Sequence, residues 1–110
     1  MKNSPTVSMK FDSAVRISLD EGLNALGESV RQTIYYHVEK GYQVKPESVP
    51  ERIETFHEAL EGLLDEGSKV VEKLIAQKLY GALGLNFTEQ EHWTIIDYLS
   101  DAKSKKKNRT

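Results

Sequence analysis

The sequence predicts an all-α fold, a compact bundle of about four to five helices around one buried axial helix at 68–83. Apolar residues recur at spacings of three and four over most of the chain, which is the period of an α-helix. One stretch is apolar around most of its circumference, as a central helix must be. The length of 110 residues, 38% of them hydrophobic, suffices for one small core, so a single helical domain at 12–102 is expected.

The axial helix is predicted from the stretch 68–84. At about 100° per residue, its apolar residues fill an arc of roughly 240°. These residues are Val70, Val71, Leu74, Ile75, Leu79, Tyr80, Ala82 and Leu83. Lys69, Lys73 and Gln77 occupy the remaining sector, which predicts one narrow solvent-exposed strip. Gly84 is expected to end the helix in a Schellman motif, because glycine adopts the left-handed conformation without a Cβ clash.

The first helical stretch is expected from 12 or 13 to about 40, after a polar and flexible arm at 1–11. A stripe of apolar residues keeps helical phase along it: Val15, Leu19, Leu23, Leu26, Val30, Ile34 and Val38. Glycine costs about 1 kcal/mol relative to alanine inside a helix. A bend or break is therefore expected near Gly27, which leaves open one bent helix or two abutting helices. Lys40 and Gly41 are expected to end the stretch.

The residues 42–50 are predicted to form a connection in which Pro46 and Pro50 can each open a helical turn. An ordinary amphipathic helix follows at about 50–64, with glutamates outside its apolar stripe. Gly67 is expected to cap the end of this helix, and Ser68 the start of the axial helix.

A last helix is predicted from 88, because Thr-Glu-Gln-Glu at 88–91 has the pattern of a capping box. Apolar residues occupy more than half of its circumference, among them Trp93, Ile95, Ile96 and Leu99. We expect a homodimer interface there. The first helix or the N-terminal arm of the same chain could cover these residues instead.

The segment 103–110 is expected to be a disordered basic tail, because it has no apolar anchor. Its positive residues are Lys103, Lys105, Lys106, Lys107 and Arg109. A solubilising terminus is the simpler interpretation, and at most weak, non-specific contact with nucleic acid is expected from it. The net charge of −2 gives no general electrostatic reason to bind nucleic acid or an anionic membrane.

The composition also limits the compartment and the chemistry. The absence of cysteine excludes disulfides, thiolate zinc sites and cysteine nucleophiles. The N-terminus has no apolar core of signal-peptide length, and no window approaches about 18 uninterrupted apolar residues. We therefore expect a soluble, cytoplasmic protein without membrane contact.

Two Glu-x-x-His pairs, Glu54 with His57 and Glu89 with His92, have the spacing seen in di-iron helical bundles. Glu54 lies roughly 130° from the apolar centre of its helix, so this pair cannot easily chelate inward. Glu89 belongs to the first turn of the predicted last helix, where a carboxylate already complements the helix dipole. A carboxylate and histidine metal-binding bundle is the least supported alternative, and no metal is expected.

Other catalytic patterns are incomplete or missing. The segment that starts at His57 begins like a zinc-protease helix but lacks the second histidine. No phosphate-binding loop or nucleophile elbow occurs either. We expect neither an enzyme nor a cofactor.

Glu72 is the one ionisable residue inside the apolar arc of the axial helix, roughly 200° from Val70. It is expected to be buried, and an unpaired buried carboxylate costs several kcal/mol or takes up a proton. Its expected donors are Tyr35, Tyr36 and His37, which lie together late in the first helical stretch. A lone carboxylate without a second acid, base or metal ligand has no reaction to run, so the cluster is predicted to be structural.

Two stretches, 26–41 and 65–85, resemble a small archaeal family of signal-transduction output domains. The matching features are Leu26-Gly27, the run Tyr35-Tyr36-His37, the Gly67-Ser68 turn, Glu72 and Leu83-Gly84-Leu85. In that family the domain is an uncharacterised helical module, found alone or attached to sensory domains, without established catalytic residues. The resemblance implies a non-enzymatic regulatory or adaptor role that acts through protein–protein contacts.

The alternative is a helix-turn-helix transcriptional regulator that binds DNA. The helix at 56–64, the tight turn at 65–68 and the following helix have suitable lengths. A recognition helix needs a wide polar face, whereas the axial helix keeps only the strip at Lys69, Lys73 and Gln77. The narrow strip favours the adaptor interpretation.

Overall fold

The computed structural model describes residues 10–108, in which five α-helices and one 3₁₀ helix occur and no strand is present. The helices are α1 (Phe11–Asn24), α2 (Glu28–Tyr42), η1 (Pro46–Arg52), α3 (Ile53–Leu64), α4 (Gly67–Ala82) and α5 (Ile95–Asn108). The prediction of an all-α fold is confirmed. Most of the predicted arm at 1–11 lies outside the described residues, and α1 already begins at Phe11.

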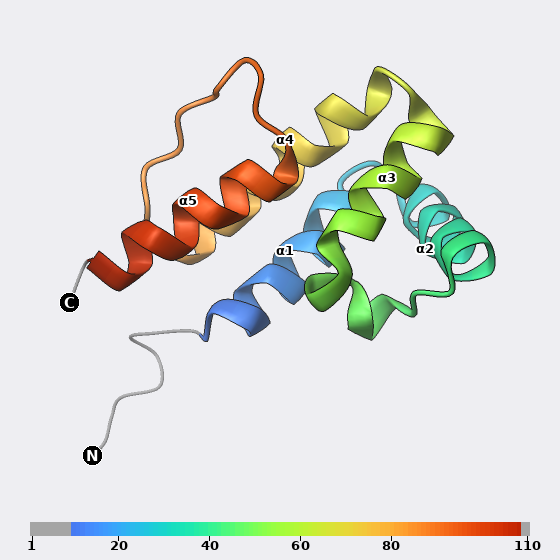
Figure 1. Ribbon diagram of the computed structural model, residues 1–110, viewed down its shortest axis with the longest axis horizontal. Coiled ribbons are helices and arrows are strands. Elements are labelled where there is room, and N and C mark those ends of the chain that lie inside the picture. The colour runs from blue at the N-terminus through green and yellow to red at the C-terminus, as the bar shows by residue number, and fades with distance from the viewer. Residues whose placement is uncertain (1–9, 109–110) are drawn as a thin grey trace.

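The axial position predicted for the fourth helix is found, since α4 packs against α1, α3 and α5. Figure 1 shows α5 lying along α4, while α2 lies at the end of the molecule opposite the C-terminus. The buried face of α4 consists of Ser68, Val71, Glu72, Ile75, Ala76, Leu79 and Tyr80. Val70 is 57% exposed and Ala82 is exposed, so the buried arc is narrower than predicted. Three neighbouring helices leave one side of α4 uncovered.

The break expected near Gly27 separates two helices. α1 ends at Asn24, and α2 begins at Glu28. Gly27 has a φ of 115°, a conformation that residues with a Cβ rarely adopt. The alternative of one bent helix does not apply.

Three of the predicted helix ends are wrong. α2 continues through Gly41 to Tyr42, and Gln43 takes the left-handed conformation after it. Gly67 does not cap α3, because Asp65 supplies the positive φ of 52° and Gly67 already belongs to α4. Ser68 does not cap α4, because its hydroxyl donates to the Asp65 carbonyl oxygen at 2.8 Å.

The predicted Schellman motif at the end of α4 is confirmed. The Leu85 N–H donates to the Tyr80 carbonyl oxygen at 2.8 Å, and the Gly84 N–H donates to that of Gly81 at 3.1 Å. Gly84 has the expected positive φ of 72°.

The predicted start of the last helix at 88 is wrong, because 85–94 is a loop and α5 begins at Ile95. Thr94 and Asp97 form the capping interaction instead: the Thr94 N–H donates to Asp97 Oδ2 at 2.8 Å. The hydroxyl of Tyr98 bonds to both the N–H and the carbonyl oxygen of Gln90, at 2.9 and 3.2 Å. In a helix from 88 the Gln90 carbonyl oxygen would accept the Thr94 N–H, but here it accepts from Tyr98 and the Thr94 N–H donates to Asp97.

The basic tail expected to be disordered from 103 is helical as far as Asn108, and the last two residues lie outside the described range. Lys105 pairs with Asp101 one turn earlier at 3.2 Å, and Lys103 lies over the Phe11 ring, 5.8 Å from its centroid. Positive side chains at a helix C-terminus also interact favourably with the helix dipole.

None of the helices within 10–108 combines the length and apolar composition that crossing a bilayer requires.

α1 and α4 approach closely at Gly22. A Cβ added at this position would lie 2.7 Å from Cγ1 of Ile75 and 3.0 Å from its Cα. Only glycine permits this backbone approach, which explains a glycine inside a buried helix face.

We predict opposite effects for two helical glycines. Gly22→Ala should lower the free energy of unfolding by about 1–3 kcal/mol, because the methyl group overpacks the α1–α4 contact. Gly81→Ala should raise it by about 0.5–1 kcal/mol, because alanine favours the helix and nothing lies within 4 Å of the new Cβ. Urea denaturation measures both values. Similar changes in both variants would contradict the close approach at Gly22.

Candidate functional site

The carboxylate of Glu72 is buried in α4, as predicted, with 3% of the residue exposed. Its Oε2 lies 2.5 Å from Nδ1 of His57, which is on α3. Its Oε1 accepts the backbone N–H of Ile95 at 3.0 Å. One side chain therefore joins α4 to the helices on either side of it.

The imidazole of His57 connects this buried carboxylate to the surface. Its Nε2 lies 3.4 Å from Oε1 of Glu61, one turn later on α3, whose side chain is 57% exposed. Because an ionised carboxylate is an acceptor, we assign His57 the Nδ1–H that donates to Glu72. The Glu61 carboxylate lies next to the ring on its other side.

The bond from Ile95 also satisfies a helix end. Ile95 is the first residue of α5, and the first four N–H groups of an α-helix have no partner within the helix. The Ile95 residue is fully buried, so its N–H could not be hydrated instead. The negative charge of a carboxylate at this end also complements the helix dipole.

The donors predicted for Glu72 are wrong. Tyr36 is 58% exposed, and His37 is exposed with its ring 5.7 Å from that of Tyr36. Tyr35 is half-buried and lines a different hollow, beside Asp20. The physical reason is that α2 packs mainly on α1 and α3, so these residues do not reach the buried face of α4.

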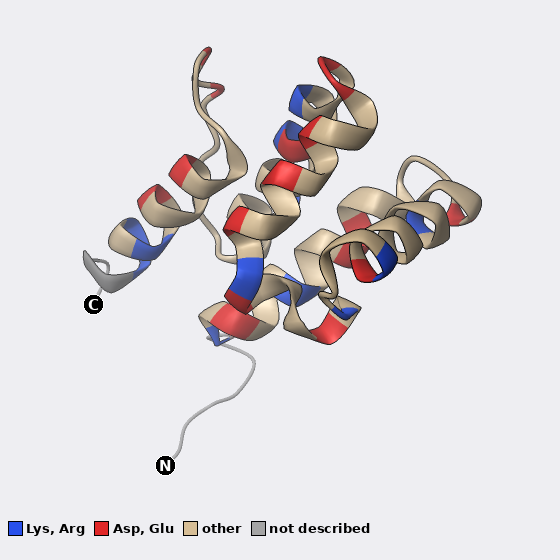
Figure 2. Ribbon diagram, turned by 45° about the vertical axis from the view of Figure 1, so that its right-hand side comes forward, with Lys and Arg blue, Asp and Glu red and all other residues tan. Residues whose placement is uncertain are grey.

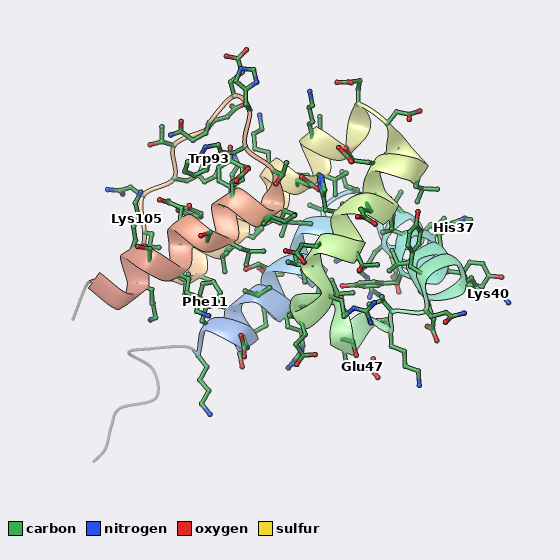
Figure 3. All side chains as sticks on the ribbon, in the orientation of Figure 1. Phe11, His37, Lys40, Glu47, Trp93 and Lys105 are labelled. Carbon is green, nitrogen blue, oxygen red and sulfur yellow. The ribbon has the colours of Figure 1, made fainter. Side chains whose placement is uncertain are left out.

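The loop 85–94 is held by aromatic side chains. The Trp93 ring lies 5.2 Å from that of Tyr98, and the Phe87 ring lies 5.3 Å from that of Tyr80. The Tyr80 hydroxyl donates to Asp101 Oδ2 at 2.5 Å, and burial together with this bond raises the pKa of Tyr80 above its usual value. Trp93 is labelled on this loop in Figure 3.

The residues predicted to form an interface are mostly covered by their own chain. Ile95 is fully buried, and Ile96 and Leu99 pack partly buried against the core. Trp93 is 38% exposed and lies on the loop before α5. The prediction left open that the same chain covers these residues, and α5 packs on α4 and α3 of its own chain. Trp93 was placed on the last helix, which begins only at Ile95.

The two Glu-x-x-His pairs are not assembled into a site. His57 bonds to Glu72, and Glu54 is exposed on α3. Glu89 pairs with Lys73 at 3.3 Å, and His92 is exposed on the loop. Within the range 10–108, no group of three or more His, Asp or Glu side chains is placed to hold a metal ion.

The helix pair considered for DNA binding is α3 and α4. The strip that would have to contact base edges is partly occupied by ion pairs within the chain, since Lys69 pairs with Glu66 and Lys73 with Glu89, each at 3.3 Å. Val70, which lies between these two lysines in the sequence, is apolar and exposed. This surface offers fewer free positive charges than the strip predicted from the sequence.

The surface of the described chain has hollows of different character. One of them, of about 520 Å³, lies between α1, α2 and η1. Ile17, Tyr35 and Pro46 line it together with charged residues of both signs. The charged residues are Arg16, Asp20, Glu21, Arg31 and Glu47. Arg31 already pairs with Asp20 at 3.1 Å, so the charges of this hollow are partly satisfied.

Two smaller hollows, of about 270 and 230 Å³, lie between α2 and α3 and share Leu63. We call them together the α2–α3 groove. Its lining residues are Ser29, Val30, Thr33, Ile34, His37, Gly41, Tyr42, Ala59, Gly62, Leu63 and Leu64. Only two of these residues have an ionisable side chain, His37 and Tyr42.

Comparisons of this chain with family models, curated protein sequences and solved structures gave no match.

We predict that Glu72→Leu lowers the free energy of unfolding by about 1–3 kcal/mol, because it leaves the Ile95 N–H and the His57 imidazole buried without their partner. Glu72→Gln should keep the fold with a smaller loss, because its amide oxygen can still accept from Ile95. Glu54→Leu, at an exposed position of α3, is the control for a lost carboxylate. Unchanged stability of Glu72→Leu in urea denaturation would show that this bonding does not hold the helices.

We also predict that stability falls at alkaline pH. Burial and the nearby Asp20 carboxylate raise the pKa of Tyr35 from 10.0 to about 12. The unfolded chain loses this proton first, so the contribution is complete below pH 10.0 and is lost as the pH rises to about 12. Tyr35→Phe should therefore flatten the decline in the free energy of unfolding over this interval. An identical decline in both chains, measured by urea denaturation at a series of pH values, would contradict the burial of this phenol.

Proposed function

We propose that this chain is a non-enzymatic regulatory or adaptor module that acts by binding another protein, as its resemblance to archaeal signalling output domains implies. The observation that carries the proposal is the distribution of exposed apolar side chains. Of the seven large hydrophobic residues that are exposed in the described part of the chain, four lie on α2 or α3: Val30, Tyr36, Tyr42 and Leu63. Three of these, Val30, Tyr42 and Leu63, line the α2–α3 groove, and exposed apolar residues gathered along a groove favour contact with a protein.

The bonding of Glu72 supports a role other than catalysis. Both carboxylate oxygens are occupied, one by His57 and one by the Ile95 N–H, and the side chain is 4% exposed. A catalytic acid must reach a substrate, whereas this carboxylate is enclosed by three helices. We therefore assign Glu72 and His57 a structural role. We also propose, from the composition of the sequence, that the module is cytoplasmic.

A homodimer through the last helix receives less support than the sequence suggested, because Ile95 belongs to the core of its own chain. The groove between α2 and α3 offers apolar residues that the described part of the chain, 10–108, leaves exposed. We therefore propose that partner binding uses the groove and not α5.

Affinity capture from a lysate of the source cells tests the proposed function with three baits. The unmodified chain and Val70→Gln, a control at an exposed apolar position outside the groove, are expected to retain the same partner. The double variant Val30→Gln, Leu63→Gln should lose it. Glutamine favours helix at both positions, so the fold should be kept, and a melting curve checks this.

Retention of the same proteins by all three baits would contradict the proposed use of the groove. Retention of no protein by the unmodified chain would contradict the adaptor function itself.

A further inference from the structure

We propose that the α2–α3 groove binds an amphipathic helix of the partner protein, with apolar residues on its docked face and basic residues along the flank next to α3. This inference rests on the proposed function and specifies the chemistry of the partner. It follows from the length of the groove, its lining and the charges beside it.

The groove has the dimensions of a helix-binding surface. On α2 its lining residues are four positions apart, at Ser29, Thr33, His37 and Gly41, so it follows one face of that helix. From 29 to 41, a rise of about 1.5 Å per residue gives roughly 18 Å, which is about three turns of a docked helix. A strand would leave its backbone hydrogen bonds unpaired there, because the walls are helices.

The lining suits an apolar ligand that approaches closely. Val30 and Leu63, one from each helix, are 40% and 38% exposed and supply apolar contact. Gly41 and Gly62 have no side chains, so a ligand can approach the helix backbones there. Nothing lies within 4 Å of a Cβ added at Gly41. A Cβ added at Gly62 would meet the Tyr42 hydroxyl at 3.5 Å. Internal packing therefore does not require glycine at either position. Gly81, which lies outside the groove, also has nothing within 4 Å of an added Cβ. Open space beside a glycine is therefore not peculiar to the groove.

The charge on the α3 side of the groove is negative. Four exposed carboxylates recur along the outer face of α3 and just beyond its end, at Glu54, Glu58, Glu61 and Asp65. Figure 2 shows these acidic positions as red segments that follow one another up the helix. Glu58 is one turn from Gly62, which places its carboxylate beside the groove.

These carboxylates have little compensation within the chain. Among the described residues, the one basic side chain within 4 Å of these carboxylates is His57, whose Nε2 lies 3.4 Å from Glu61. Like charges three and four positions apart on a helix repel each other. Basic side chains on a docked helix would relieve this repulsion, so the charge of the groove favours a basic partner.

A second copy of the chain fits this surface less well. A symmetric pair formed through the groove would bring two acidic α3 helices together. The basic end of α5 could supply positive charge from a second copy, but its segment 103–106 consists of lysine and serine without an apolar side chain for the groove. Figure 3 shows His37 and Lys40 directed outward from α2, so the basic residues of a docked helix are placed on its other flank, next to α3.

Fluorescence anisotropy with two labelled synthetic peptides tests the proposal. Both peptides have leucine at the spacings of an amphipathic helix, and the remaining positions are lysine in one and glutamate in the other. The lysine peptide should bind at least about tenfold more tightly than the glutamate peptide. Its affinity should fall as the salt concentration rises.

Variants of the chain locate the binding surface. The double variant Val30→Gln, Leu63→Gln should weaken binding of the lysine peptide about tenfold, because it removes the apolar anchors. Glu58→Gln should weaken it several-fold. The matched controls Val70→Gln and Glu47→Gln, exposed positions on α4 and η1, should leave the affinity unchanged.

Equal binding of the two peptides, or equal effects of the groove and control variants, would overturn the proposal. So would failure of the lysine peptide to bind. If light scattering showed a dimer that the double variant separates, the groove would instead be assigned to a second copy. The capture experiment decides the proposed function separately, because a partner lost from the double variant supports an adaptor even when the lysine peptide does not bind.

Discussion

The need of one buried carboxylate for hydrogen-bond donors constrains how three helices of this protein are arranged. Glu72 takes its two donors from neighbouring helices, the imidazole of His57 on α3 and the first N–H of α5 at Ile95. Because each donor is fixed to a helix, satisfying the carboxylate also determines where α5 begins and how α3 lies on α4. A buried donor left without its acceptor costs about 1–3 kcal/mol, which is a large part of the stability of a small domain.

The same helix, α3, separates the structural role from the proposed binding role. Successive residues of a helix point about 100° apart, so His57 can face Glu72 while Glu58 faces solvent beside the groove. α1 and α4 make the most extensive helix contact of the molecule, with the close approach at Gly22. α2 and α3 carry four of the seven exposed large hydrophobic residues of the described chain. Figure 1 shows α2 at the end of the molecule opposite the C-terminus. A partner that binds there need not disturb the bonds of Glu72.

Helical periodicity predicted the fold class, the central position of α4 and the burial of Glu72, because burial depends on the position of a residue within its own helix. It did not predict the donor, because that depends on which helices pack together. His57 could have been found: it and Glu72 lie at similar distances from the turn at 65–66, and a tight turn brings two antiparallel helices face to face. The start of α5 was misplaced because Thr88 and Thr94 both begin a capping pattern. The choice between them depends on tertiary bonds of the Tyr98 hydroxyl to the loop, which no local pattern contains.

Hydrogen exchange at the Ile95 amide, followed by NMR, tests the central role of Glu72 most directly. As the first residue of α5, Ile95 has no acceptor within its own helix, so its protection must come from the Glu72 carboxylate. The amide should exchange as slowly as the core amides of α4 in the unmodified chain, and should lose this protection in Glu72→Leu. Fast exchange of Ile95 in the unmodified chain, or equal protection in the variant, would contradict the account.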